Sequence, residues 1–166
     1  MKKAVAFVLI AALLADVFAS RAVLAMPDED IIRNNCTTAQ STLSRIEKAD
    51  AVARINRGHD YSEALGLMFA MNARLAANQI AAPELTTITA EFSSRFNDFR
   101  SHYDVYDDAM SNAITIKCDA QPIEFYTQLE RTRTARAVVK TDVDSLNDNI
   151  SVYYEKFDAL MREIKP

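Results

Sequence analysis

The sequence predicts an all-α protein: an antiparallel, coiled-coil-like bundle of three long helices at about 37–79, 83–117 and 121–164. The first observation is composition, because the 166 residues include only 2 glycines and are rich in the residues that favour helix. The second is that apolar residues recur at alternating steps of three and four, the pattern of the packed face of helices in bundles. The third is a pair of distant cysteines, which limits how the helices can be connected.

The first 25 residues have the pattern of a secretory signal peptide. The basic residues Lys2 and Lys3 precede an apolar run over residues 4–15, and two small-residue sites follow it, ending at Ala19 and Ala25. We expect cleavage after Ala25, with Ala19 as the alternative. The run is shorter than the roughly 20 residues of a membrane span, so an uncleaved N-terminal anchor is the less favoured interpretation.

The mature chain, residues 26–166, is long enough for a single helical-bundle domain and is expected to be acidic. Removal of the signal peptide at 1–25 takes away three of the 19 basic and one of the 23 acidic residues, which leaves a net charge of −6 (16 minus 22). A nucleic-acid or anionic-membrane binder would carry a basic face, so this balance argues against both. No second apolar stretch reaches membrane length, so no span is expected in the mature chain. The expected partner is an unknown protein or envelope component.

The first predicted helix has two alternative interpretations. Thr37 and Gln40 fit a capping box, which places the start of the helix directly after Cys36. Gly58 and the capping pattern at 60–63 then allow a chain reversal, which would make a four-helix bundle. The alternative is one continuous rod, with a stutter in its apolar seam near Gly58.

The cysteines favour the rod. In an exported chain, Cys36 and Cys118 are expected to form a disulfide, because their spacing fits neither a metal site nor a CxxC motif. Reversals at Gly58 and Pro83 would leave them about 40 Å apart, whereas a disulfide needs Cα atoms within about 7 Å. A rod that turns near residue 82 brings them to the same end, but Cys36 overshoots by about ten residues, or about 15 Å of helix. We therefore expect the start of this helix to bend, fray or fold back.

The second and third helices have local start signals and long seams. Pro83 suits the first turn of the second helix, and Asp119 can cap the third, which has Pro122 in its first turn. We interpret the aromatic residues of the second helix as core rather than as a ligand platform, because their spacing averages 3.5. The two seams contain Phe92, Phe96, Phe99, Tyr103, Tyr106, Met110 and Ala113, and Leu129, Thr132, Arg136, Val139, Val143, Leu146, Ile150, Tyr153, Phe157, Leu160 and Ile164.

The common catalytic signatures are missing from the sequence. Two glycines are too few for a P-loop or a dinucleotide-binding GxGxxG, and there is no GxSxG, HExxH or CxxC. The Glu-x-x-His pairs of di-iron bundles are also missing. We therefore expect no enzyme activity and no cofactor.

Antiparallel packing of the three predicted helices would place polar residues in one band near the middle of the bundle. Antiparallel pairing about residues 82 and 120 places His59, Asp60 and Tyr61 level with His102, Tyr103 and Asp104, and places Asp104 level with Arg136. The favoured interpretation is a polar layer that sets helix register, with Arg136 satisfied by tyrosine hydroxyls and Asp104. A recognition groove for an anionic or peptide ligand is the second interpretation, and a metal site built on the two histidines and a carboxylate is the third. The band contains His59, Asp60, Tyr61, His102, Tyr103, Asp104, Tyr106 and Arg136.

Several stretches resemble a group of small exported helical proteins of ultra-small host-associated bacteria, a group without a characterised activity. The resemblance implies a cysteine-pinned helical bundle in the cell envelope or secreted, and it implies no activity or binding residues. A second, weaker similarity is to periplasmic helical chaperones with an LTxxQ motif, for which residues 85–89 have Thr in place of Gln. The stretches that carry the first resemblance are Asn35-Cys36, RINRG at 54–58, KCDAQPIEFYTQLERTRTAR at 117–136, and Tyr153-Tyr154.

Three functions are compatible with these patterns. The favoured one is a non-enzymatic, exported interaction or structural protein that presents a helical surface to a partner. The first alternative is an extracytoplasmic helical chaperone with an exposed apolar concave face. The second is a metal-binding protein or metal-dependent enzyme that uses His59 and His102.

Overall fold

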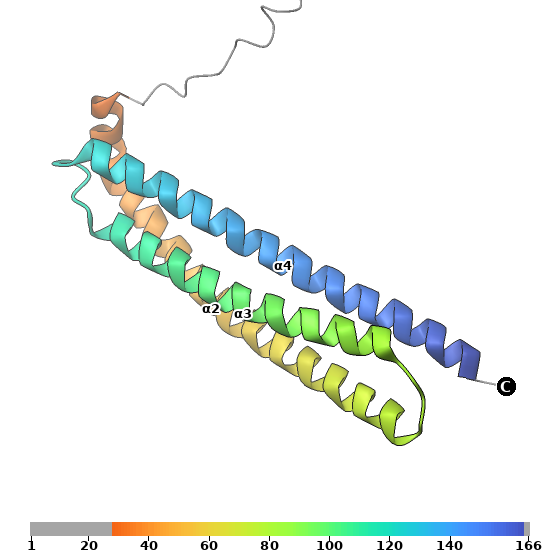
Figure 1. The fold of residues 1–166 in the computed structure, drawn as a ribbon. Helices are drawn as coiled ribbons and strands as arrows, with labels where there is room; N and C mark the ends of the chain where they lie inside the picture. Colours follow the sequence, from red (N-terminus) through yellow and green to blue (C-terminus); the bar gives the residue numbers. More distant parts are fainter. Residues whose placement is uncertain (1–27, 165–166) are drawn as a thin grey trace, which may run out of the picture.

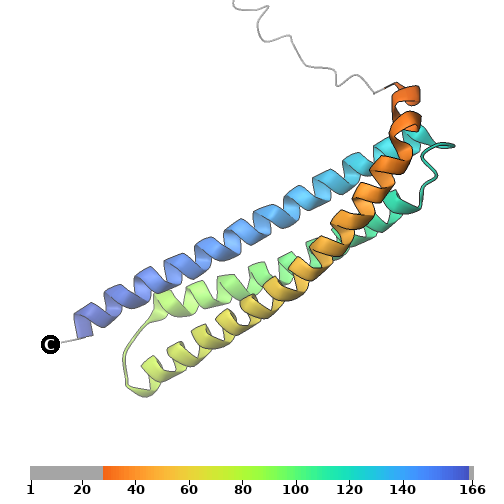
Figure 2. The same ribbon diagram turned by 180° about the vertical axis from the view of Figure 1, so that it is seen from behind.

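The computed structural model describes residues 28–164 and confirms a bundle of three long helices (Figure 1). Helix α2 spans Glu29–Ala77, α3 spans Pro83–Thr115 and α4 spans Pro122–Ile164. Consecutive helices run in opposite directions, so the α2–α3 turn and the α3–α4 connection lie at opposite ends of the bundle (Figures 1 and 2). The predicted signal peptide lies outside the described residues. No helix within 28–164 combines the length and the apolar character needed to cross a membrane.

Helix α2 is one continuous rod, as predicted, but it starts earlier than expected. It begins at Glu29 rather than near Thr37, because Asp28 caps it: the Asp28 side chain accepts a hydrogen bond of 2.9 Å from the backbone N–H of Asp30. Acidic residues in this first turn also suit the positive end of the helix dipole. The capping pattern at 37–40 therefore lies inside the helix, and the helix passes through Gly58 without a break.

Cys36 and Cys118 form the predicted disulfide, with Cα atoms 5.5 Å apart. The expected overshoot is resolved without fraying or folding back, because the register differs from the one predicted. Asp50 meets Tyr106, so the two helices pair about a point near residue 79 rather than 82. The chain after α3 also begins extended at Ile116, and extended residues advance by up to about 3.3 Å each rather than 1.5 Å. Both differences carry Cys118 further toward Cys36.

The α3–α4 connection is held against α2 by polar contacts as well. Gln40 on α2 donates hydrogen bonds of 3.3 and 2.7 Å to the backbone carbonyls of Ile114 and Ile116. These carbonyls belong to the end of α3, where helical partners run out. Arg33 donates a further hydrogen bond of 3.3 Å to the Asp119 carbonyl. This end of the bundle therefore depends on α2 being in place.

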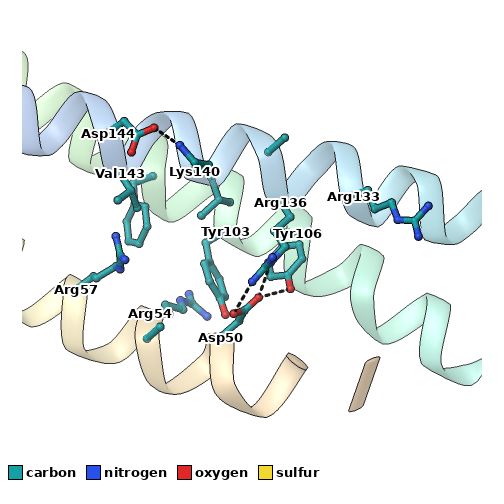
Figure 3. A pocket seen from close by; sticks show the side chains of 14 residues that line it. Asp50, Arg54, Arg57, Tyr103, Tyr106, Arg133, Arg136, Lys140, Val143 and Asp144 are labelled. Carbon is teal, nitrogen blue, oxygen red and sulfur yellow. Dashed lines mark hydrogen bonds and ion pairs between the residues drawn. The ribbon is translucent and has the colours of Figure 1, made fainter. Parts of the chain in front are cut away.

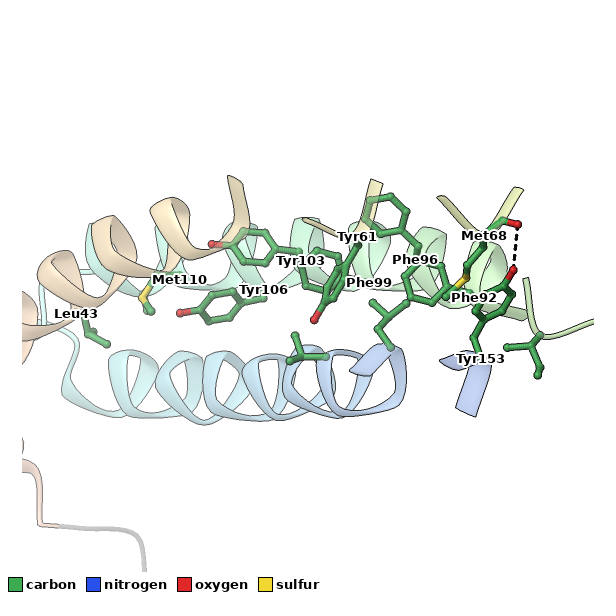
Figure 4. Packing of buried hydrophobic residues seen from close by; sticks show 14 of the residues in the cluster. Leu43, Tyr61, Met68, Phe92, Phe96, Phe99, Tyr103, Tyr106, Met110 and Tyr153 are labelled. Carbon is green, nitrogen blue, oxygen red and sulfur yellow. Dashed lines mark hydrogen bonds between the residues drawn. The ribbon is translucent and has the colours of Figure 1, made fainter. Parts of the chain in front are cut away.

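The aromatic seam of α3 forms the centre of the core, as predicted (Figure 4). Phe92, Phe96 and Phe99 are at most 2% exposed. Tyr61 of α2 packs edge-on against all three rings at centroid distances of 5.7–6.1 Å, a favourable aromatic geometry. Helix α3 is in contact with both other helices, whereas contact between α2 and α4 is the smallest of the three. The side of the bundle between α2 and α4 is therefore its most open side.

We expect Gly58→Ala to raise the free energy of unfolding by about 0.5–1 kcal/mol, because glycine is costly in a helix interior. A methyl group at Gly58 would meet no atom within 4 Å, and the same holds for Gly66. Gly66→Ala is thus a matched control on the same helix, and urea unfolding of both variants is the measurement. A loss of stability confined to Gly58→Ala would contradict a continuous helix at this position.

Candidate binding groove between α2 and α4

A cavity of about 540 Å³ opens between α2 and α4 near the middle of the bundle (Figure 3). Its floor is aromatic and comes from α3, whereas its two walls are largely basic. Arg54 and Arg57, three residues apart, lie on one face of α2. The α4 wall repeats at steps of three and four, so its cations also share one face. The floor contains Phe99, Tyr103 and Tyr106, and the α4 wall contains Arg133, Arg136 and Lys140.

One polar layer crosses the cavity and connects all three helices. The Asp50 carboxylate accepts two hydrogen bonds from the Arg136 guanidinium, at 2.9 and 3.1 Å, and one of 2.6 Å from the Tyr106 hydroxyl (Figure 3). Such bidentate pairing is the strong form of the arginine–carboxylate interaction. Asp50 comes from α2, Tyr106 from α3 and Arg136 from α4. The layer therefore sets the relative height of the helices.

The layer shifts the pKa values of its members. Partial burial raises the pKa of Asp50, but the hydrogen bonds from Arg136 and Tyr106 outweigh it, so the net pKa lies below the ordinary value of 3.8. Burial, followed by the hydrogen bond to Asp50, raises the pKa of Tyr106 well above its ordinary value. The hydrogen bond to Asp50 likewise raises the pKa of Arg136. At neutral pH the layer is therefore a carboxylate held by a guanidinium and a neutral phenol.

We expect Asp50→Asn to lower the free energy of unfolding by about 1–2 kcal/mol at pH 7, less than for a fully buried pair because the Arg136 side chain is 58% exposed. Because the folded-state pKa of Asp50 is depressed, its contribution is present above about pH 4 and is lost as the pH falls through the folded pKa. The difference between wild type and variant should therefore shrink below pH 4 in urea unfolding. Asp104→Asn is the control, because Asp104 is 65% exposed and its pair with Arg54 should contribute less. An equal loss at pH 3 and pH 7 would contradict the assignment.

A second contact lies beside the layer. The Arg54 guanidinium lies over the Tyr103 ring, 4.7 Å from its centroid, and pairs with Asp104 at 2.7 Å. Burial, and then the nearby carboxylates of Asp107 and Asp50, raise the pKa of Tyr103 to about 12. The tyrosine therefore stays neutral and offers its ring to the cation.

The predicted polar layer exists, but its membership differs from the prediction. Arg136 is satisfied by Asp50, whereas Asp104, its predicted partner, pairs with Arg54 instead. On α2, Arg54 rather than Asp60 lies level with Asp104, which is a shift of about one and two-thirds helical turns. The physical reason is the turn between α2 and α3, which is centred earlier than we assumed from Pro83.

The predicted meeting of His59 with His102 is wrong. His59 faces away from the core and lies 3.4 Å from Glu63 on its own helix, with 71% of its side chain exposed. His102 lies between α3 and α4, with its Nδ1 2.8 Å from Asp142. No group of three His, Cys, Asp or Glu side chains within 28–164 has the spacing to hold a metal ion.

The remaining members of the predicted band separate as well. Tyr61 is buried in the aromatic core and donates a 3.3 Å hydrogen bond to Asn147 of α4, while Asp60 is exposed. The charged groove residues that the predicted band lacked are Asp50, Arg54, Arg57, Arg133 and Lys140. The position of Asp50 could have been predicted from its spacing, because it lies four residues after Ile46 and three before Ala53 in the seam of α2. A charged residue at a seam position is unusual and should have placed Asp50 in the band.

The fold and the groove define the class: a three-helix bundle closed by one disulfide, with a basic cleft along its open side. Comparison of the chain with protein-family models, curated proteins and solved structures gave no match. The function therefore has to be argued from the geometry of the groove.

Proposed function

We propose that this chain is a non-enzymatic, exported protein that binds a partner through the groove between α2 and α4. One observation carries the proposal: five basic side chains from two helices surround one open cavity in a chain whose net charge is −4. Asp50 and Asp144 also line this cavity, so it holds three more basic than acidic side chains, and this excess favours a negatively charged partner. The aromatic floor adds apolar area for contact.

Export is part of the proposal. It is supported by the signal-peptide pattern at residues 1–25 and by the Cys36–Cys118 disulfide, a feature typical of oxidising compartments. An intact mass of the exported protein, measured without reductant, reports both points. The expected mass corresponds to a chain that starts at Met26 and contains one disulfide, whereas a chain that starts at Met1 would contradict export by cleavage.

Site-specific photo-crosslinking in the cells that produce the protein tests the groove. A photoreactive residue at Ala53, on the wall of the cavity, is expected to give a discrete adduct. The same residue at Ala90, which is exposed on α3 away from the groove, is the control and should give none. Identical adducts from both positions, or turnover of a substrate by the purified protein, would count against the proposal.

An extracytoplasmic chaperone is a second candidate, favoured by large apolar side chains that lie exposed on α2. Ile55, Leu67 and Phe69 are each at least 55% exposed. Chaperone activity requires that the protein suppress aggregation of a chemically denatured client at near-equimolar ratio. If Ile55→Ser and Phe69→Ser together leave suppression unchanged, these residues are not the client surface.

A further inference from the structure

The basic cavity is the middle section of a longer groove along the open side of the bundle. Toward the disulfide, a cavity of about 420 Å³ continues it and shares Arg133 and Arg136 with it. Ile46 and Leu129 give this end its apolar character. The groove therefore continues beyond the basic section in this direction.

At the far end of the same side, another cavity of about 210 Å³ lies between α2 and α4. It is lined by apolar side chains, and two of them are unusually open: Leu67 is 61% exposed and Tyr154 is 60% exposed. Between this cavity and the basic one, the Tyr61 hydroxyl of α2 donates a hydrogen bond to Asn147 of α4. The order along the groove is thus apolar, basic, apolar.

The charges in the middle section are not all used within the protein. Arg136 is paired with Asp50 and Arg54 with Asp104. Arg57 forms no ion pair with any Asp or Glu of residues 28–164. Its guanidinium therefore has hydrogen-bonding capacity left for a carboxylate from outside.

On the opposite wall, Lys140 and Arg133 pair only with neighbours on their own helix. Lys140 contacts Asp144 one turn along α4, and Arg133 contacts Glu130. Such exposed pairs contribute little, so a ligand carboxylate can compete for either cation. Arg57, Lys140 and Arg133 together form a basic section that an acidic segment would match.

The length and the walls of the groove indicate the conformation of that segment. From Ile46 to Met71 the α2 wall is about 38 Å long, and from Leu129 to Phe157 the α4 wall is about 42 Å long. A strand in this groove would leave its backbone N–H and C=O groups unpaired, because the walls are helices whose own backbone groups are bonded internally. A helix satisfies its own backbone and can seat an apolar face between two others.

We infer that the groove receives an acidic amphipathic helix from a partner protein, with large apolar side chains toward both ends and Glu or Asp residues at its centre. This helix would complete a four-helix bundle and cover the side that α2 and α4 leave open. The inference rests on the proposed function, since it names the chemistry of the partner that the groove binds.

The probe is a designed, fluorescein-labelled peptide of roughly 26 residues, the length that spans the groove as a helix. It carries Leu and Phe on one face near both ends and three Glu residues on that face at the centre. Fluorescence anisotropy with the oxidised exported protein measures affinity, and circular dichroism measures the helix gained on mixing. We expect saturable one-to-one binding with a gain of helix.

Charge reversal at the basic section gives the sharpest readout. Arg57→Glu together with Lys140→Glu should weaken binding by roughly tenfold or more, because like charges would then face each other. Lys48→Glu together with Arg95→Glu changes the net charge equally at exposed positions outside the groove and should leave the affinity within about twofold. The groove-reversed protein should in turn prefer a peptide with Lys in place of the three Glu residues. Leu67→Ser together with Tyr154→Ser should weaken binding at the apolar end.

Three results would overturn the inference. Equal binding of an unstructured polyglutamate peptide would mean that the groove recognises negative charge without a helix. Stronger binding to vesicles containing phosphatidylglycerol would assign the groove to a membrane surface. Weak binding that the groove reversal leaves unchanged would place the peptide elsewhere. None of these results alters the crosslinking at Ala53, so failure of the inference is distinguishable from failure of the proposed function.

Discussion

Replacing Cys36 and Cys118 with serine is expected to lower the free energy of unfolding by about 4–5 kcal/mol. The disulfide closes a segment with a sequence separation of 82, and a loop of this size loses much conformational entropy in the unfolded chain when it is cross-linked. Urea unfolding of the oxidised wild type and of the double variant measures the difference. Wild-type protein reduced with dithiothreitol should reproduce the stability of the variant.

The same change is expected to loosen one end of the bundle selectively. The start of α2 is connected to the α3–α4 connection through the disulfide, through Gln40 and through Arg33. Amide hydrogen exchange in residues 29–40 should therefore accelerate more than exchange near Phe92 in the core. A uniform acceleration along all three helices would contradict a local role, and a loss of less than about 1 kcal/mol would contradict the entropic account.

Phe99→Ala is expected to cost about 3–5 kcal/mol, the range found when a large buried aromatic side chain is removed. Phe99 is 2% exposed, contacts Tyr61 edge-on at 5.7 Å and contributes to the floor of the basic cavity. The substitution would remove both the aromatic contacts and the support beneath the groove. Thermal or urea unfolding gives the magnitude.

Phe69→Ala is the matched control, because it removes the same atoms from a side chain that is 55% exposed. Its cost is expected to stay within about 0.5 kcal/mol. If both variants lost the same stability, the seam of α3 would not be the core that the buried aromatic residues define.

Much of the fold was predictable from local chemistry. Pro83 and Pro122 mark the starts of α3 and α4 because proline lacks the N–H that the first helical turn leaves unused. The aromatic residues at steps of three and four identified the buried face of α3 before any packing was known. The cysteine pair favoured a continuous helix over a reversal at Gly58, because that reversal would have placed the sulfurs at opposite ends.

The candidate groove was predictable only in part. Arg136, Tyr103 and Tyr106 belonged to the predicted band and do line the basic cavity. The partners on α2 were assigned wrongly, because in an antiparallel pair an error of a few residues in the position of the turn shifts every contact by twice that number. The prediction therefore placed Asp60 rather than Arg54 level with Asp104, and it placed His59 in the band although His59 faces outward.

Composition and periodicity were enough to predict the helical class and the buried face of α3, because both depend on residues that are neighbours on one helix, and the cysteine pair favoured three helices over four. The heights at which the helices meet depend instead on how side chains of different helices fit together. Only packing could therefore decide that Asp50 holds Arg136, that the two histidines lie apart, and that α2 and α4 leave a basic groove between them.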